Sequence, residues 1–173
     1  MRRRALGLLL CGLVGASQAT EQIPDRIQLD GQDAVVLAEP LSSVLDDPAT
    51  WQRFVAHAGS ALGACSANWR GYQAFWRVDG NRLLLDRVVL GACADAPPTL
   101  PLPVLFPNRR APVVADWVDG EVLVALPDPP APGTPASALP YVLLQLRHGQ
   151  VIRREPLTPA QLAARRAAPD ASP

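Results

Sequence analysis

Reactive side chains are scarce in this sequence, and histidine is the scarcest of those that bind metals. The 173 residues include two histidines, His57 and His148, and no lysine, so all 16 basic residues are arginine. The sequence has no His-Glu-x-x-His motif, no Cys-x-x-Cys pair and no acidic loop of the calcium-binding kind. We therefore expect no bound metal and no other cofactor.

Several signatures of common enzymes are also missing. There is no Gly-x-Ser-x-Gly motif, no phosphate-binding glycine loop and no dinucleotide fingerprint. Asp86 and Asp116 would form a carboxylate pair of the type that glycosidases use only if their strands met; solvated or arginine-paired carboxylates are the alternative. The sequence predicts no catalytic residue and favours a protein that is not an enzyme.

Apolar stretches long enough to span a membrane are missing as well. The apolar run Ala5–Val14 is about ten residues long, half of the roughly twenty that a spanning helix needs. It follows three arginines at 2–4 and precedes Ser-Gln-Ala at 17–19, which is the order of a secretory signal peptide. We expect cleavage after residues 1–19, a periplasmic or secreted mature chain beginning at Thr20, and no stable membrane span after processing. A retained anchor is the alternative.

The charge balance of the mature chain is slightly acidic. The three arginines of the leader are part of 16 basic residues, so 13 basic and 16 acidic residues remain, for a net charge of −3. A nucleic-acid partner requires a basic surface. We therefore expect no nucleic acid among the partners.

Cysteine is rare, and its positions predict one crosslink. Cys11 lies in the leader, and lipidation there is disfavoured because the preceding residue, Leu10, is not small. Cys65 and Cys93 remain in the mature chain, an even number that in an exported protein predicts a disulfide. Two buried free thiols are the alternative.

The clearest structural pattern is a β-hairpin. Two β-prone runs, Arg70–Val78 and Arg82–Leu90, flank an Asp-Gly turn at 79–80. Alternation predicts one core face for the first strand, formed by Tyr72, Ala74, Trp76 and Val78. Pairing of the two strands would bring both cysteines to the open end of the hairpin, so the hairpin and the disulfide support each other.

The rest of the chain predicts further hairpins and one helix. The predicted elements are a strand pair over Ile27–Leu37 turning at Asp30-Gly31, a helix over Pro48–Ala58, a hairpin of Val113–Val118 with Val122–Leu126, and a hairpin of Tyr141–Arg147 with Gln150–Glu155. The proline-rich segments Ala94–Pro103 and Pro127–Leu139 are predicted loops. The fold class is therefore α+β, with a mainly antiparallel sheet of hairpins, one packed helix and one disulfide. We expect a single domain over 20–157, followed by a short helix or a disordered tail over 158–173.

Two short motifs carry a resemblance to other proteins. Trp69-Arg70-Gly71-Tyr72 opens the first hairpin, and Ala115-Asp116-Trp117, after Leu105-Phe106-Pro107, lies in the second. This pattern resembles a group of small uncharacterised bacterial proteins that share a Trp-Arg-Gly-Tyr hairpin and an Ala-Asp-Trp hairpin. The resemblance implies no activity.

The same motifs supply the candidate binding residues, which are Trp69, Arg70, Tyr72, Asp116 and Trp117. Their flat rings would stack on a ligand or partner, while Arg70 or Asp116 would fix its orientation. The alternative is that the aromatic rings are core and that Arg70 pairs with Asp116 to tie the hairpins together. The loop Pro127–Leu139 would either recognise a partner or act as a spacer.

Export, small size and the missing catalytic set together favour one functional class. We expect an exported, non-enzymatic protein of the bacterial envelope that binds a macromolecular partner, in an inhibitor or immunity role. A periplasmic module for a small ligand or glycan is the first alternative, and it predicts a concave pocket lined by Trp69, Tyr72 and Trp117. An enzyme of unrecognised type is the second alternative.

Overall fold

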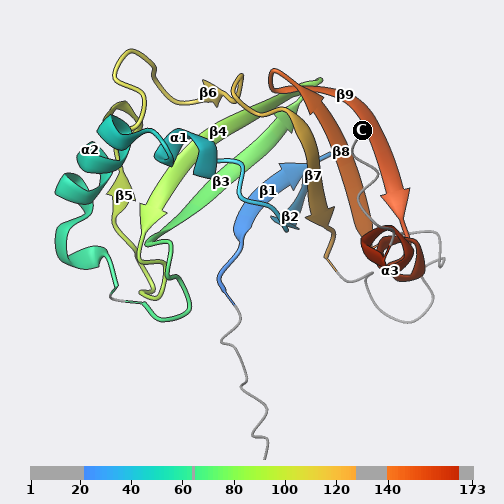
Figure 1. The fold of residues 1–173 in the computed structure, drawn as a ribbon, viewed down its shortest axis with the longest axis horizontal. Helices are drawn as coiled ribbons and strands as arrows, with labels where there is room; N and C mark the ends of the chain where they lie inside the picture. The colour runs from blue at the N-terminus through green and yellow to red at the C-terminus, as the bar shows by residue number, and fades with distance from the viewer. Residues whose placement is uncertain (1–21, 64, 128–139, 168–173) are drawn as a thin grey trace, which may run out of the picture.

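A computed structural model of the chain describes residues 22–63, 65–127 and 140–167. All nine described strands join one continuous sheet, and short helices pack around it (Figure 1). The elements in chain order are β1 Asp25–Leu29, β2 Gln32–Val36, α1 Ser42–Leu45, α2 Pro48–Ala58, η1 Gly59–Ala61, β3 Tyr72–Asp79, β4 Arg82–Leu90, β5 Thr99–Leu100, η2 Leu102–Val104, β6 Val113–Val114, β7 Gly120–Ala125, β8 Tyr141–Arg147, β9 Gln150–Leu157 and α3 Pro159–Ala167.

The sheet closes on itself into a seven-stranded barrel, which the sequence did not predict. Its strand order is β3-β1-β2-β7-β8-β9-β4, and β4 pairs again with β3. Two of the strand pairings that complete the barrel join segments far apart in the sequence. In the first, β1 runs parallel to β3, with Ile27 opposite Trp76. In the second, β4 meets β9 in a short antiparallel contact between Arg82 and Gln150. Closure removes the open edges that a set of separate hairpins would leave exposed.

Three of the predicted hairpins are present. The pairs β1–β2, β3–β4 and β8–β9 are antiparallel and turn at the predicted places. The predicted core face of β3 is confirmed, because Tyr72, Ala74 and Trp76 are buried and Val78 is half-buried. These hairpins form because their alternating apolar residues can face one interior while turn residues reverse the chain.

The fourth predicted hairpin, Val113–Val118 with Val122–Leu126, is wrong. The first run supplies only the two residues of β6, which pair with β4, whereas β7 pairs with β2 and β8. The Asp119 side chain binds the turn between β8 and β9, where its Oδ1 accepts a hydrogen bond of 2.8 Å from the backbone N–H of His148. The Asp-Gly sequence therefore connects two regions of the barrel instead of closing a local turn.

The predicted helix is confirmed with its predicted bounds, as α2. The Asp47 carboxylate accepts a 2.8 Å hydrogen bond from the backbone N–H of Thr50, and Pro48 occupies the first turn. Of the apolar face expected to pack on the sheet, Phe54 is buried but Trp51 remains 46% exposed. The structure adds α1, and Pro159–Ala167 form α3 within the segment 158–173, for which a short helix was one of the two expectations. Figure 1 shows α2 and α3 on opposite sides of the molecule.

The proline-rich segment Ala94–Pro103 is less irregular than expected. It contains β5, which pairs with β4, and the beginning of η2. Prolines at its flanks confine this pairing to two residues, since a proline cannot donate to the ladder.

The predicted disulfide is confirmed. Cys65 and Cys93 are bonded, with their Cα atoms 5.6 Å apart, at the open end of the β3–β4 hairpin. A disulfide is consistent with an extracellular or otherwise oxidising compartment.

Several predictions fall on residues outside the described part of the chain. These are the signal peptide with Cys11, the loop after Pro127, and the end of the tail from residue 168. Among the described residues, no helix combines the length and the apolar character needed to span a bilayer.

Candidate functional site

Arg70 and Tyr72 lie at the entrance of β3, around the buried carboxylate of Asp25. This carboxylate is 0% exposed and accepts three hydrogen bonds, from the backbone N–H of Ala74 at 3.0 Å, from Nε1 of Trp76 at 3.1 Å and from Nη2 of Arg70 at 3.3 Å. Each donor belongs to β3 or to the residues leading into it. The Asp25 side chain therefore fixes the start of β1 against β3.

Burial sets the protonation chemistry of this group. It raises the pKa of Asp25 above its ordinary value of 3.8, although the Ala74 N–H and the Arg70 guanidinium act in the opposite direction. Burial likewise raises the pKa of Tyr72, so the phenol stays neutral across the physiological range. Neither group is exposed to a substrate.

Arg70 is held on several sides. Its side chain is 7% exposed, its Nη2 donates to the carbonyl of Ile23 at 2.9 Å, and its Nε lies 3.8 Å from the Glu39 carboxylate. The guanidinium carbon also lies 5.0 Å from the centre of the Tyr72 ring. Arg70 and Tyr72 belong mainly to the interior, as the alternative interpretation of the aromatic rings expected.

The predicted pairing of Arg70 with Asp116 does not form. Asp116 instead accepts a hydrogen bond from Nη1 of Arg109 at 2.8 Å, and both side chains are about half exposed. The two motifs are linked in a different way, through the segment Glu39-Pro40. Glu39 approaches Arg70, while the carbonyl of Pro40 accepts a hydrogen bond from Nε1 of Trp117 at 2.8 Å.

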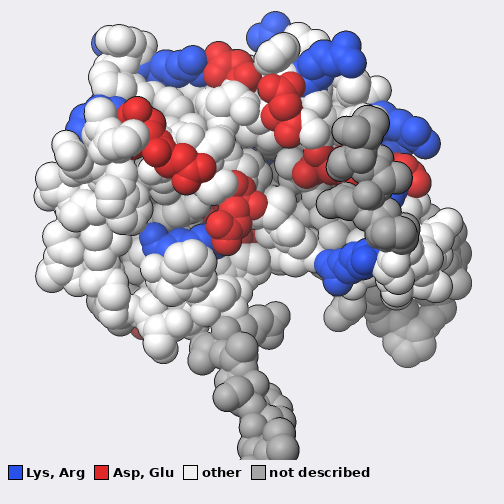
Figure 2. Space-filling model, viewed as in Figure 1, with Lys and Arg blue, Asp and Glu red and all other residues white. Residues whose placement is uncertain are grey.

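Trp117 lies in the wall of a surface hollow. Its ring stacks on Phe106 with 4.7 Å between ring centres and is half-buried. The hollow has a volume of about 360 Å³, and its polar lining includes Glu39, Asp119 and Glu121. Figure 2 shows acidic side chains gathered on the face that carries α1.

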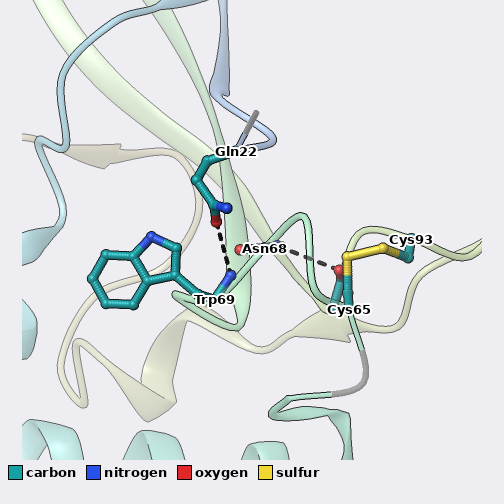
Figure 3. The surroundings of a disulfide bond; sticks show 6 residues. Gln22, Cys65, Asn68, Trp69 and Cys93 are labelled. Carbon is teal, nitrogen blue, oxygen red and sulfur yellow. Dashed lines mark hydrogen bonds between the residues drawn. A yellow bond between two sulfur atoms is a disulfide. The ribbon is translucent and has the colours of Figure 1, made fainter. Parts of the chain in front are cut away.

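Trp69 differs from the other candidates because its indole faces solvent. It is 71% exposed, the highest value among the exposed large hydrophobic side chains of the described residues. Figure 3 shows the ring pointing away from the disulfide. We call residues 65–71, which present it, the Trp69 loop.

The Trp69 loop is held by hydrogen bonds and by the disulfide. The backbone N–H of Trp69 donates to Oε1 of Gln22 at 3.0 Å, and that of Asn68 donates to the carbonyl of Cys65 at 3.0 Å (Figure 3). Asn68 itself is 1% exposed, and its Nδ2 lies 3.4 Å from the carbonyl of Gly91. The exposed indole therefore projects from an ordered support.

Three residues of this region were not predicted from the sequence. Gln22, Asp25 and Glu39 all contact the candidate residues but come from the N-terminal part of the chain. Of the three, only Asp25 had a recognisable signal in the sequence, its position at the start of an apolar strand. A carboxylate buried in a core needs a positively charged partner. Nothing in the sequence specified which arginine that would be.

The residues considered for catalysis or metal binding are dispersed. Asp86 pairs with Arg77 at 2.9 Å and Asp116 pairs with Arg109 at 2.8 Å, so both are the arginine-paired carboxylates of the alternative interpretation. His148 lies 3.4 Å from the carboxylate of Asp119, and His57 lies in the last turn of α2. Within the described ranges, no three side chains of metal-binding type come together.

Comparisons with protein-family models, with curated proteins and with solved structures each found no match to this chain. The resemblance to the group that shares the two hairpin motifs stays a prediction.

Proposed function

We propose that this chain is an exported protein of the bacterial envelope that has no enzymatic activity and binds a macromolecular partner, in the role of an inhibitor or immunity protein. The observation that carries the proposal is Trp69, a tryptophan that is 71% exposed on a loop fixed by the Cys65–Cys93 disulfide.

An exposed tryptophan is costly to leave in water and valuable in an interface. Burying apolar surface stabilises association by roughly 25 cal/mol per Å², and tryptophan is among the residues that most often dominate binding energy. The Trp69 loop is already ordered by the hydrogen bond from Trp69 to Gln22 and by the one from Asn68 to Cys65, so less conformational freedom would be lost on binding. These features support a role for Trp69 as the anchor of a protein interface.

Export is supported by two independent features. The first nineteen residues have the order of a signal peptide, and the mature chain carries a disulfide that an oxidising compartment would preserve. An envelope location also suits a protein whose partner is itself exported.

The small-ligand or glycan alternative predicted that three aromatic rings would share a pocket. Tyr72 is 3% exposed and packs edge-on against Phe54, Trp117 lies in the acidic hollow, and Trp69 projects into solvent. The three rings thus have three different surroundings, which favours a protein surface over a stacking pocket for one sugar.

The test is capture of the partner by the oxidised chain from the native periplasm, followed by measurement of the affinity with the purified partner. We expect Trp69→Ala to weaken binding by about thirtyfold or more, the range of an interface anchor. Trp51→Ala is the matched control because Trp51 is also an exposed tryptophan, 46% exposed, but lies on α2. Arg70 is unsuitable for this test because its buried contacts stabilise the fold.

Binding that is lost with Trp69→Ala and kept with Trp51→Ala would support the proposal. If both variants bound the partner equally well, the interface would lie away from Trp69, and the exposed indole would no longer support the proposal. Recovery of no stoichiometric protein by a folded, disulfide-bonded bait would overturn it.

A further inference from the structure

Two arginines flank a phenylalanine on the outer wall of the barrel. Arg26 of β1 lies opposite Phe75 of β3, and Phe75 lies opposite Arg87 of β4, so the three residues form a row across adjacent strands. Their neighbours Ile27 and Trp76 are buried, which assigns the row to the outer face. Arg26 and Arg87 are both exposed.

The guanidinium of Arg87 is displaced toward Arg26. Its central carbon lies 3.6 Å above the centre of the Phe75 ring, which is a close cation–π contact. It therefore lies over β3, and neighbouring strands are separated by only about 4.8 Å. The contact places two positive groups on the same strip of surface and leaves the edge of the Arg87 guanidinium available for hydrogen bonds.

An irregularity in β4 builds the rest of this site. The register between β3 and β4 shifts at Phe75/Trp76, so Asp86 is the extra residue of a β-bulge beside Arg87. Bulges redirect side chains and occur often beside functional sites. A hollow of about 390 Å³ opens here, lined by residues of β1 to β4 that include Arg26, Phe75, Asp86 and Arg87.

The two carboxylates that line the hollow have partners, whereas its two arginines form no ion pair among the described residues. Asp86 is neutralised by Arg77, whose Nε lies 2.9 Å from its carboxylate, and Asp33 accepts a 3.4 Å hydrogen bond from Gln28. Neither Arg26 nor Arg87 has a carboxylate within ion-pair distance among the described residues. Two like charges placed close together repel each other unless an anion lies between them.

We propose that this hollow is a binding site for an oxyanion, a phosphate or carboxylate group held between the guanidinium groups of Arg26 and Arg87. Guanidinium groups bind both anions through paired N–H donors. Phe75 positions Arg87 by stacking and makes no contact with the oxyanion itself. The site is independent of the Trp69 loop, and it gives the protein a second means of recognition, for an anionic small molecule.

The test uses the full chain with its disulfide formed. Inorganic phosphate and malonate are titrated separately against sodium chloride of equal ionic strength, and the Nε–H resonances of Arg26 and Arg87 are followed by NMR. We expect saturable shifts with at least one of the two oxyanions and none with chloride. Saturation by phosphate alone or by malonate alone identifies the group that the site prefers.

Variants separate this site from general anion effects. We expect Arg87→Gln and Arg26→Gln each to weaken binding about tenfold, since each removes one charged donor group. Arg82→Gln is the matched control, because Arg82 is an exposed arginine that lies on β4, as Arg87 does, but outside the hollow. The Arg82→Gln variant should bind the oxyanion with the affinity of the wild type. Shifts that do not saturate, or that are the same in all three variants, would overturn the proposal.

Discussion

Arg70 and Asp25 form a buried ion pair that joins the segment leading into β3, two residues before its first residue, to the first residue of β1. Nη2 of Arg70 lies 3.3 Å from Oδ1 of Asp25, and the two side chains are 7% and 0% exposed. Because β1 and β3 are parallel, no local turn can hold them together. The pair supplies part of that connection through side chains.

Removing the positive partner should be severely destabilising. We expect Arg70→Ala to lower the free energy of unfolding by about 3–5 kcal/mol, because it leaves a buried carboxylate without its charged partner. Urea denaturation provides the measurement. Arg77→Ala is the control, since its pair with Asp86 is more than a third exposed, and it should cost about 1 kcal/mol or less. Equal losses in the two variants would contradict the role given to the buried pair.

Asp25 should also contribute a recognisable pH dependence. Because burial raises its folded-state pKa above 3.8, its contribution to stability is fully present below pH 3.8 and is lost as pH rises through the folded-state value. Carbon-13 NMR of the carboxyl group should therefore show a midpoint above 3.8. The stability of the wild type relative to Asp25→Asn should increase as pH falls through that midpoint. A midpoint at or below 3.8 would show that the hydrogen bonds outweigh burial.

Loss of the disulfide should destabilise the fold without changing its topology. The bond closes a loop with a sequence separation of 28 residues. For such a loop, the chain-entropy model gives a stabilisation of about 3 to 4 kcal/mol. We expect the double variant Cys65→Ser, Cys93→Ser to lose this amount in urea denaturation, and the reduced wild type to lose the same. A loss below about 1 kcal/mol would show that the Trp69 loop is ordered by its hydrogen bonds alone.

Gly149 lies in the turn before β9, close to the barrel closure, and Gly31 is a matched reference for testing how tightly the chain packs there. Gly149 and Gly31 have similar positive φ values, of 70° and 79°. A Cβ on Gly149 would lie 2.5 Å from the carbonyl oxygen of Ala115, whereas a Cβ on Gly31 would meet nothing within 4 Å. Gly31→Ala should cost about 1–2 kcal/mol, for backbone conformation alone.

Gly149→Ala should cost clearly more, about 3 kcal/mol or above, because the obstructing atoms are backbone and cannot move aside. Thermal denaturation of both variants at one pH measures the difference. Similar losses would show that the β8–β9 turn can shift away from Ala115 without cost.

Local structure was predictable from the sequence, and long-range pairing was not. The helix Pro48–Ala58 has its cap and its first-turn proline within three residues, and the β3–β4 hairpin has an Asp-Gly turn between alternating strands. Such signals arise from neighbouring residues. The parallel pairing of β1 with β3 and the contact of β4 with β9 depend on residues far apart in the chain, for which a single sequence holds no pattern.

The candidate residues show the same division. Trp69, Arg70 and Trp117 were selected because they lie in two distinctive motifs, and the structure links the motifs through Glu39-Pro40 instead of through Arg70 and Asp116. The Asp-Gly pair at 119–120 was misleading, because its aspartate binds the backbone of His148. Short motifs identified the residues but could not identify their partners.

The contact that closes the barrel also dictates when closure can happen. Among the described residues β9 is the last strand, and its residue Gln150 pairs with Arg82 of β4. During synthesis from the N terminus, the earlier strands are available long before β9 leaves the ribosome. The sheet therefore cannot close until β9 has been synthesised, whatever pairings the earlier strands have already formed.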